Sequence, residues 1–135
     1  MTLGIQLQQG LTALGLALPE SAQAQLLGYL VLLKKWNATY NLTSIREESA
    51  MLTQHLFDSL SILPHIEKSA LATRRWIDVG SGAGLPGIPL AIACPQLQMA
   101  LIDSVDKKTA FQRQVKIELG LSNLTILGGR VENQP

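Results

Sequence analysis

The hydrophobic positions in the first half of the chain repeat with the period of an α-helix. Leucines three or four residues apart mark a first helix: Leu3, Leu7, Leu11 and Leu14. A second apolar stripe begins after Pro19, which is favoured at a helix start, and continues to Trp36. After a connection over residues 37–45, a third stripe predicts one continuous helix over residues 47–63. We therefore expect an all-helical segment over residues 1–72.

Beyond that segment, short apolar runs of strand length alternate with helical stretches. The expected order is strand, helix, strand, helix, strand, over residues 76–79, 86–93, 98–103, 105–119 and 124–127. This βαβαβ order is typical of a parallel sheet with right-handed crossovers. The sequence therefore predicts an α/β fold in which residues 73–135 form the first half of a doubly wound domain.

The three expected strands suggest an incomplete sheet. In the usual doubly wound order the first strand is central, whereas here it would be an uncovered edge. We therefore expect the chain to be a fragment without its C-terminal half, weakly active or inactive as an enzyme, and able to self-associate through the exposed edge.

Composition and charge narrow the class of protein. Of 135 residues, 47% are hydrophobic, which favours a folded domain, and the net charge of +1 allows an RNA surface only as a local patch. The single cysteine, Cys94, cannot form an internal disulfide, and two histidines without clustered spacing give no metal site. Because no secretory leader opens the chain and no apolar run approaches about 20 residues, we expect a cytoplasmic protein with no membrane partner.

The most informative motif is the glycine-rich run over residues 78–87. It follows an apolar strand and precedes a helix, and it contains four glycines: Gly80, Gly82, Gly84 and Gly87. Glycines let a ligand approach the backbone, and the following helix start offers unpaired N–H groups. Asp103 ends the next strand nineteen residues after Gly84, near where a carboxylate accepts hydrogen bonds from ribose hydroxyls. The pattern predicts a nucleotide-binding corner.

Two registers of these glycines compete. The first, Gly82-x-Gly84-x-x-Gly87, fits a nicotinamide dehydrogenase, although Asp103 follows Gly87 by only sixteen residues where about 20 is usual. The second, Gly80-x-Gly82-x-Gly84 preceded by Asp78, fits methyltransferases that use S-adenosylmethionine. A non-enzymatic RNA-binding fragment is a third interpretation.

Several separated motifs favour the second register. The chain resembles the ribosomal RNA small subunit methyltransferase G family, also called glucose-inhibited division protein B. The matching segments are 35–44, His55 with Asp58 and Ser59, 78–90, 103–108 and 130–132. The family usually has arginine where Lys108 stands, and its C-terminal half is missing here.

This resemblance implies a Rossmann-like methyltransferase fold and transfer of a methyl group from S-adenosylmethionine to N7 of a guanine in bacterial 16S small-subunit ribosomal RNA. The residues that would contact the cofactor are Gly80, Gly82, Gly84, Leu85, Asp103, Ser104, Val131 and Glu132. Those that would serve the RNA or the reacting base are Arg130, Asn41 and His55. The candidates for contact with the RNA backbone are Lys34, Lys35, Arg46, Arg74, Arg75, Lys107, Lys108, Arg113 and Lys116.

Overall fold

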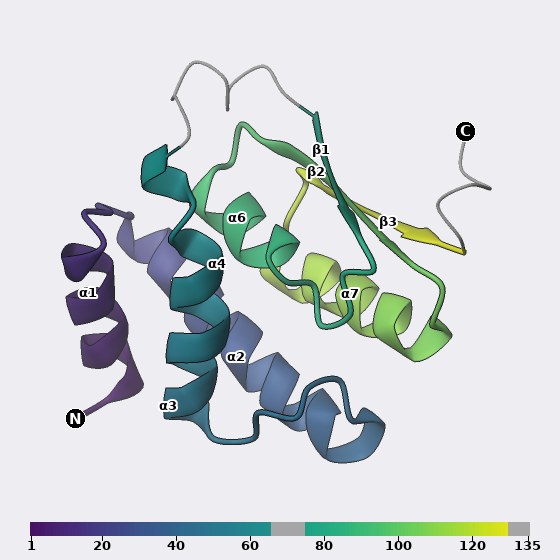
Figure 1. Ribbon diagram of the computed structural model, residues 1–135, viewed down its shortest axis with the longest axis horizontal. Helices are drawn as coiled ribbons and strands as arrows, with labels where there is room; N and C mark the ends of the chain where they lie inside the picture. Colours follow the sequence, from purple (N-terminus) through teal and green to yellow (C-terminus); the bar gives the residue numbers. More distant parts are fainter. Residues whose placement is uncertain (66–74, 130–135) are drawn as a thin grey trace.

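The structure, a computed structural model, describes residues 1–65 and 75–129. The first half contains α1 (Leu3–Ala13), α2 (Glu20–Tyr40), α3 (Glu48–Met51), the π-helical segment η1 (Leu52–Phe57), α4 (Asp58–Leu60) and the 3-10 turn η2 (Leu63–His65). The second half contains β1 (Arg75–Val79), α6 (Gly87–Ala93), β2 (Gln98–Asp103), α7 (Asp106–Leu119) and β3 (Leu124–Gly128). Figure 1 shows the helical half lying beside the sheet. The predicted α/β fold with a helical N-terminal segment is confirmed.

The sheet is parallel and has the order β1-β2-β3. Asp78 pairs with Leu101 across β1 and β2, and Asp103 pairs with Gly128 across β2 and β3. β1 is therefore an edge strand, as expected. Because all three strands run in the same direction, their carboxyl ends meet at one end of the sheet, where ligands bind in open α/β folds.

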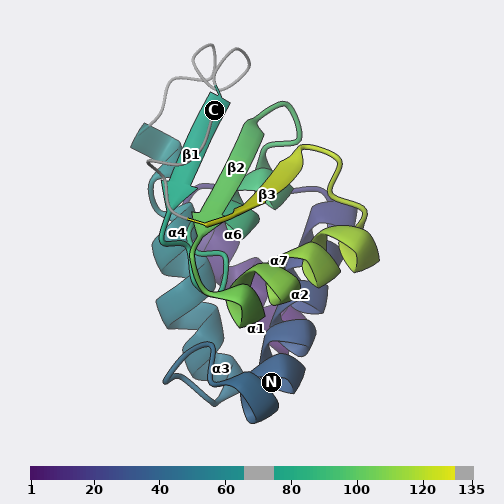
Figure 2. The same cartoon turned by 90° about the vertical axis from the view of Figure 1, so that its right-hand side faces the viewer.

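The two faces of the sheet differ in cover. α6 and α7 lie on one face, and α2 packs against both of these helices (Figure 2). On β1 the side chains of Ile77 and Val79 are 63% and 58% exposed, so apolar surface of the edge strand remains open to solvent. The expected self-association through this edge stays a prediction.

One hydrophobic core joins the helical half to the α/β half. Tyr29 from α2 and Phe111 from α7 are both fully buried, and their ring centroids lie 6.2 Å apart. Trp36 adds a second aromatic contact with Phe111, at 5.7 Å. The helical half therefore packs directly on the layer that covers the sheet. None of the helices in residues 1–65 and 75–129 combines the length and apolarity that crossing a membrane requires.

α2 continues beyond the predicted end at Trp36 and stops at Tyr40. Asn41 ends it in the left-handed conformation, with φ 51°, and donates its backbone N–H to the Asn37 carbonyl at 3.1 Å. Asn37 therefore lies in the helix and not in the connection expected over residues 37–45. It is buried in the last turn, where its Oδ1 accepts the Thr43 N–H at 2.8 Å. This hydrogen bond ties the end of α2 to the loop that follows.

The continuous helix predicted over residues 47–63 is interrupted. α3 passes into the π-helical segment η1, and regular α-helical bonding resumes only at Asp58. Hydrophobic periodicity does not reveal such a widening, because the wider π-helical turn takes up one added residue and leaves the apolar stripe nearly continuous. Leu52 and Leu56 on η1 remain buried as expected.

α1 packs against η1, and Gly10 on α1 lies at the contact. A Cβ atom at Gly10 would collide with the Phe57 ring, whereas one at Gly4 would meet only Leu27 Cδ1, at 3.8 Å. We expect Gly10→Ala to lower the free energy of unfolding by about 1–3 kcal/mol through overpacking. The matched Gly4→Ala should raise it by up to about 1 kcal/mol through helix propensity. Urea unfolding measures both, and equal effects of the two substitutions would contradict the packing.

Candidate functional site

The glycine turn lies at the carboxyl end of β1 and leads into α6. Its first residue is tied to the neighbouring strand, because the Gly80 N–H donates to the Ile102 carbonyl at 2.7 Å. Gly80, Gly82 and Gly84 have φ values of 69°, 58° and 88°. L-residues with side chains rarely adopt such values. The chain path of this turn therefore requires glycine at these three positions.

The four glycines of the run serve two different purposes. A Cβ atom added at Gly80 or Gly82 would meet nothing within 4 Å, so the backbone faces open space there. A Cβ atom at Gly84 would collide with Ile88, and one at Gly87 would collide with Leu101. Gly80 and Gly82 thus leave room for a ligand, whereas Gly84 and Gly87 allow α6 to pack closely.

Asp103 stands beside the turn, at the end of β2. Its Oδ2 accepts the Gly82 N–H at 2.8 Å, and its Oδ1 accepts the Val105 N–H at 2.9 Å. The side chain is only 6% exposed. A carboxylate oxygen has a second lone pair, so both oxygens can still accept a hydrogen bond from a ligand hydroxyl. Ser104, the next residue, is exposed.

Two side chains that sequence reasoning missed hold the turn from inside the protein. Gln112 on α7 is fully buried, and its Nε2 donates to Ser81 Oγ and to the Gly82 carbonyl, both at 2.8 Å. The Tyr29 hydroxyl donates to the Ala83 carbonyl at 2.7 Å. The sequence carried one signal for both residues: each places a polar group on the buried face of a helix, and a buried polar group needs a hydrogen-bond partner.

Asp78 fixes the start of α6. Its Oδ2 accepts the Gly87 N–H at 3.0 Å. Partial burial raises the pKa of Asp78, the Gly87 N–H lowers it, and the negative charge of Asp103 raises it. Burial also raises the pKa of Tyr29, with a further contribution from the Asp78 charge. The glycine turn therefore lies between the carboxylates of Asp78 and Asp103, in a place that is partly shielded from water.

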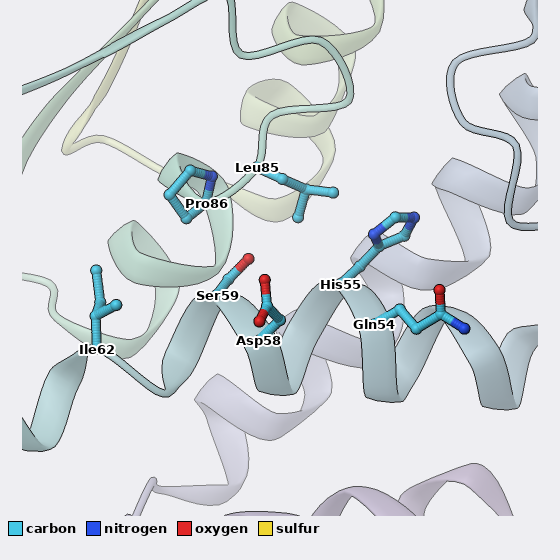
Figure 3. A pocket seen from close by; sticks show the side chains of 7 residues that line it. All are labelled: Gln54, His55, Asp58, Ser59, Ile62, Leu85 and Pro86. Atoms are coloured by element: carbon cyan, nitrogen blue, oxygen red, sulfur yellow. The ribbon is translucent and has the colours of Figure 1, made fainter.

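His55 on η1 faces the other end of the turn. Figure 3 shows His55 and Leu85 near each other in the lining of a hollow of about 280 Å³. The hollow is lined by Gln54, His55, Asp58, Ser59, Ile62, Leu85 and Pro86. The His55 Nε2 lies 2.9 Å from Thr43 Oγ1. Burial lowers the pKa of His55, while the backbone hydrogen bond of Gln54 and the charge of Asp58 raise it.

The remaining predicted site residues are less close to the turn. Asn41 caps α2, and its Oδ1 accepts a hydrogen bond from Arg46 Nη2 at 2.9 Å. The structure therefore pairs Asn41 with Arg46, and it places His55 and Leu85 in the lining of one hollow. Arg130, Val131 and Glu132 lie outside the described residues, as does Arg74.

Known proteins match this chain over most of its length. A family model described as rRNA small subunit methyltransferase G matches residues 22–135. A relative named ribosomal RNA small subunit methyltransferase G, from Neisseria meningitidis serogroup C, is 52% identical over 127 residues, which are 94% of this chain and 59% of the relative. Relatives of the same name from Nitrosospira multiformis and Burkholderia thailandensis are 53% and 55% identical, over 94% and 97% of this chain.

The chain spans 56% to 59% of the length of these relatives. Both the family model and the relatives' names agree with the methyltransferase register of the glycines. They do not favour the alternative of a nicotinamide dehydrogenase.

The carboxyl group of Asp78 makes the stability of the turn depend on pH. A pKa raised in the folded state means that the folded chain binds this proton more tightly than the unfolded chain, so the contribution to stability falls as pH rises through that pKa. We expect Asp78→Asn, which keeps an acceptor for the Gly87 N–H, to gain stability relative to the parent chain as pH rises from about 4 towards 7. Urea unfolding across this range measures the difference, and a constant difference would contradict the assignment.

Proposed function

The chain belongs to the rRNA small subunit methyltransferase G family, and on that premise we propose that it binds S-adenosylmethionine for methylation of guanine N7 in small-subunit ribosomal RNA. One observation carries the proposal. At the carboxyl end of β1, Gly80 and Gly82 face open space directly beside the carboxylate of Asp103. This arrangement combines room for a ligand with an acceptor for its hydroxyl groups.

The residues of the turn fit this cofactor. The open side of Gly80 and Gly82 would accept the methionine and ribose portions, since no side chain has to move. Asp103 would accept the ribose hydroxyls through the lone pairs that its two backbone hydrogen bonds leave free. Leu85 would border the cofactor where α6 begins, and Ser104 would line the adenosine pocket. When bound, S-adenosylmethionine supplies a methyl group on a positively charged sulfur.

The chemistry requires alignment rather than proton abstraction. Guanine N7 carries an in-plane lone pair and no proton, so its attack on the methyl group needs no general base. The residues around the turn then have to hold the base and the methyl donor in line, and stabilise positive charge as it develops on the base.

The RNA contacts are proposed from the resemblance together with charge. Arg130 would contact the RNA or the reacting base, and Val131 and Glu132 would border the adenine. Lys107 on α7 is exposed close to the end of β2 and would contact the RNA backbone. Binding through such contacts should weaken steeply with salt, because condensed counterions are released.

A pair of glycine substitutions separates cofactor binding from backbone strain. Gly80 and Gly120 have nearly the same φ, 69° and 66°, and both face open space. Alanine at either position should therefore lower the free energy of unfolding by a similar amount, about 1–2 kcal/mol. Only Gly80→Ala should weaken binding of S-adenosylhomocysteine, roughly tenfold or more in Kd. Titration calorimetry measures the affinity, and an equal loss in Gly120→Ala would contradict the proposed site.

The reaction itself can be followed with labelled cofactor. We expect this chain to transfer radiolabelled methyl groups from S-adenosylmethionine to small-subunit ribosomal RNA only at a low rate, with the label recovered as 7-methylguanosine after nuclease digestion. Asp103→Ala should abolish the transfer, because the ribose hydroxyls lose their acceptor. Label recovered on another atom would contradict the N7 assignment. Unchanged cofactor affinity in Asp103→Ala would remove Asp103 from the site.

A further inference from the structure

The hollow between η1, α4 and the glycine turn is lined by Leu85 and Pro86 of the turn and not by Gly80 or Gly82. Four of its residues, 55, 58, 59 and 62, come from η1, α4 and the turn that follows, and they line the hollow together. In Figure 3 the carboxylate of Asp58 and the hydroxyl of Ser59 point from the helix towards Leu85 and Pro86. The hollow thus has a polar floor on the helix and an apolar wall on the turn.

Asp58 is the carboxylate that lines this hollow. Its side chain is exposed, and among residues 1–65 and 75–129 no hydrogen bond satisfies its carboxylate. The hydrogen bond from Ser61 Oγ goes to the Asp58 backbone carbonyl instead. A carboxylate can accept two parallel N–H donors, one at each oxygen. Among the standard RNA bases, only guanine presents two such donors side by side, at N1 and at the exocyclic N2.

The dimensions of the hollow suit one base. Its volume of about 280 Å³ lies just below the range of about 300–1,000 Å³ typical of ligand pockets. Leu85, Pro86 and Ile62 supply apolar surface for contact with the faces of a planar ring. The His55 ring is fixed by Thr43 and so presents a second flat surface in a defined orientation.

We propose that this hollow receives the guanine that is to be methylated, and that Asp58 recognises it by accepting hydrogen bonds from N1–H and N2–H. This assignment rests on the proposed function. In guanine, N7 lies on the edge opposite to N1 and N2. A base held by Asp58 therefore turns N7 away from the helix, towards the turn to which Leu85 belongs. Asp58 acts as a specificity-determining residue of the same site.

Binding of a short single-stranded RNA tests the proposal without requiring catalysis. The ¹⁵N-labelled chain is saturated with S-adenosylhomocysteine and titrated with oligouridine that carries one central guanine. We expect the amide resonances of His55, Ser59 and Leu85 to shift. Replacing the guanine by inosine, which lacks only N2, should weaken binding roughly tenfold, because a hydrogen bond to a charged acceptor is lost. Guanosine monophosphate, titrated in parallel, should bind more weakly than the oligonucleotide.

Asp58→Asn provides the decisive variant. It should remove the preference for guanine over inosine, while Glu118→Gln, an exposed carboxylate on α7, should keep the preference. Equal affinity of the parent chain for the two oligonucleotides would overturn the proposal, as would an undiminished preference in Asp58→Asn. Tighter binding of free guanosine monophosphate than of the oligonucleotide would overturn the assignment to RNA.

The cofactor titration separates this proposal from the proposed function. If S-adenosylhomocysteine binds but guanine is not preferred, the base assignment fails and the cofactor site stands. If guanine is preferred and S-adenosylhomocysteine does not bind, the base site stands and the proposed cofactor is wrong.

Discussion

The hydrogen bond from the Tyr29 hydroxyl to the Ala83 carbonyl connects the two halves of the molecule at the point where the site is built. It spans 54 positions of sequence and is fully buried. A buried carbonyl or hydroxyl left without a partner costs about 1–3 kcal/mol. The glycine turn therefore adopts its path against α2, and the N-terminal helices are part of the site rather than an attachment to it.

Gln112 on α7 holds the same turn through further hydrogen bonds. Its side-chain amide binds Ser81 and Gly82, while the carboxylate of Asp103 binds the Gly82 N–H. α2, α7 and β2 each contribute one polar group to a turn that has no side chains of its own at the glycines. Such a turn is held in one conformation before a ligand arrives, which reduces the entropy lost on binding.

The sequence was sufficient for the elements whose pattern is local. Alternating strands and helices, the glycine turn between β1 and α6, and the place of Asp103 at the end of β2 all follow from residues near one another in the chain. What could not be predicted depends on side-chain partners that the local pattern does not specify. Asn37 lies in the last turn of α2 and bonds to the loop that follows, and Gln112 meets a glycine turn 30 positions away because α7 lies behind that turn. Arg130 remains a prediction from the sequence.

The π-helical segment η1 has a consequence for chain length. A π-helical turn takes up one more residue than an α-helical turn, and each residue of an α-helix advances the side chains by about 100° around the axis. Because the wider turn already takes up the extra residue, loss of a single residue from Leu52–Phe57 would let the helix run on regularly with Asp58 and Ser59 facing nearly the same way. In a regular α-helix the same loss would turn every later side chain by about 100°, so this stretch should tolerate a one-residue deletion better than the regular helices of the chain.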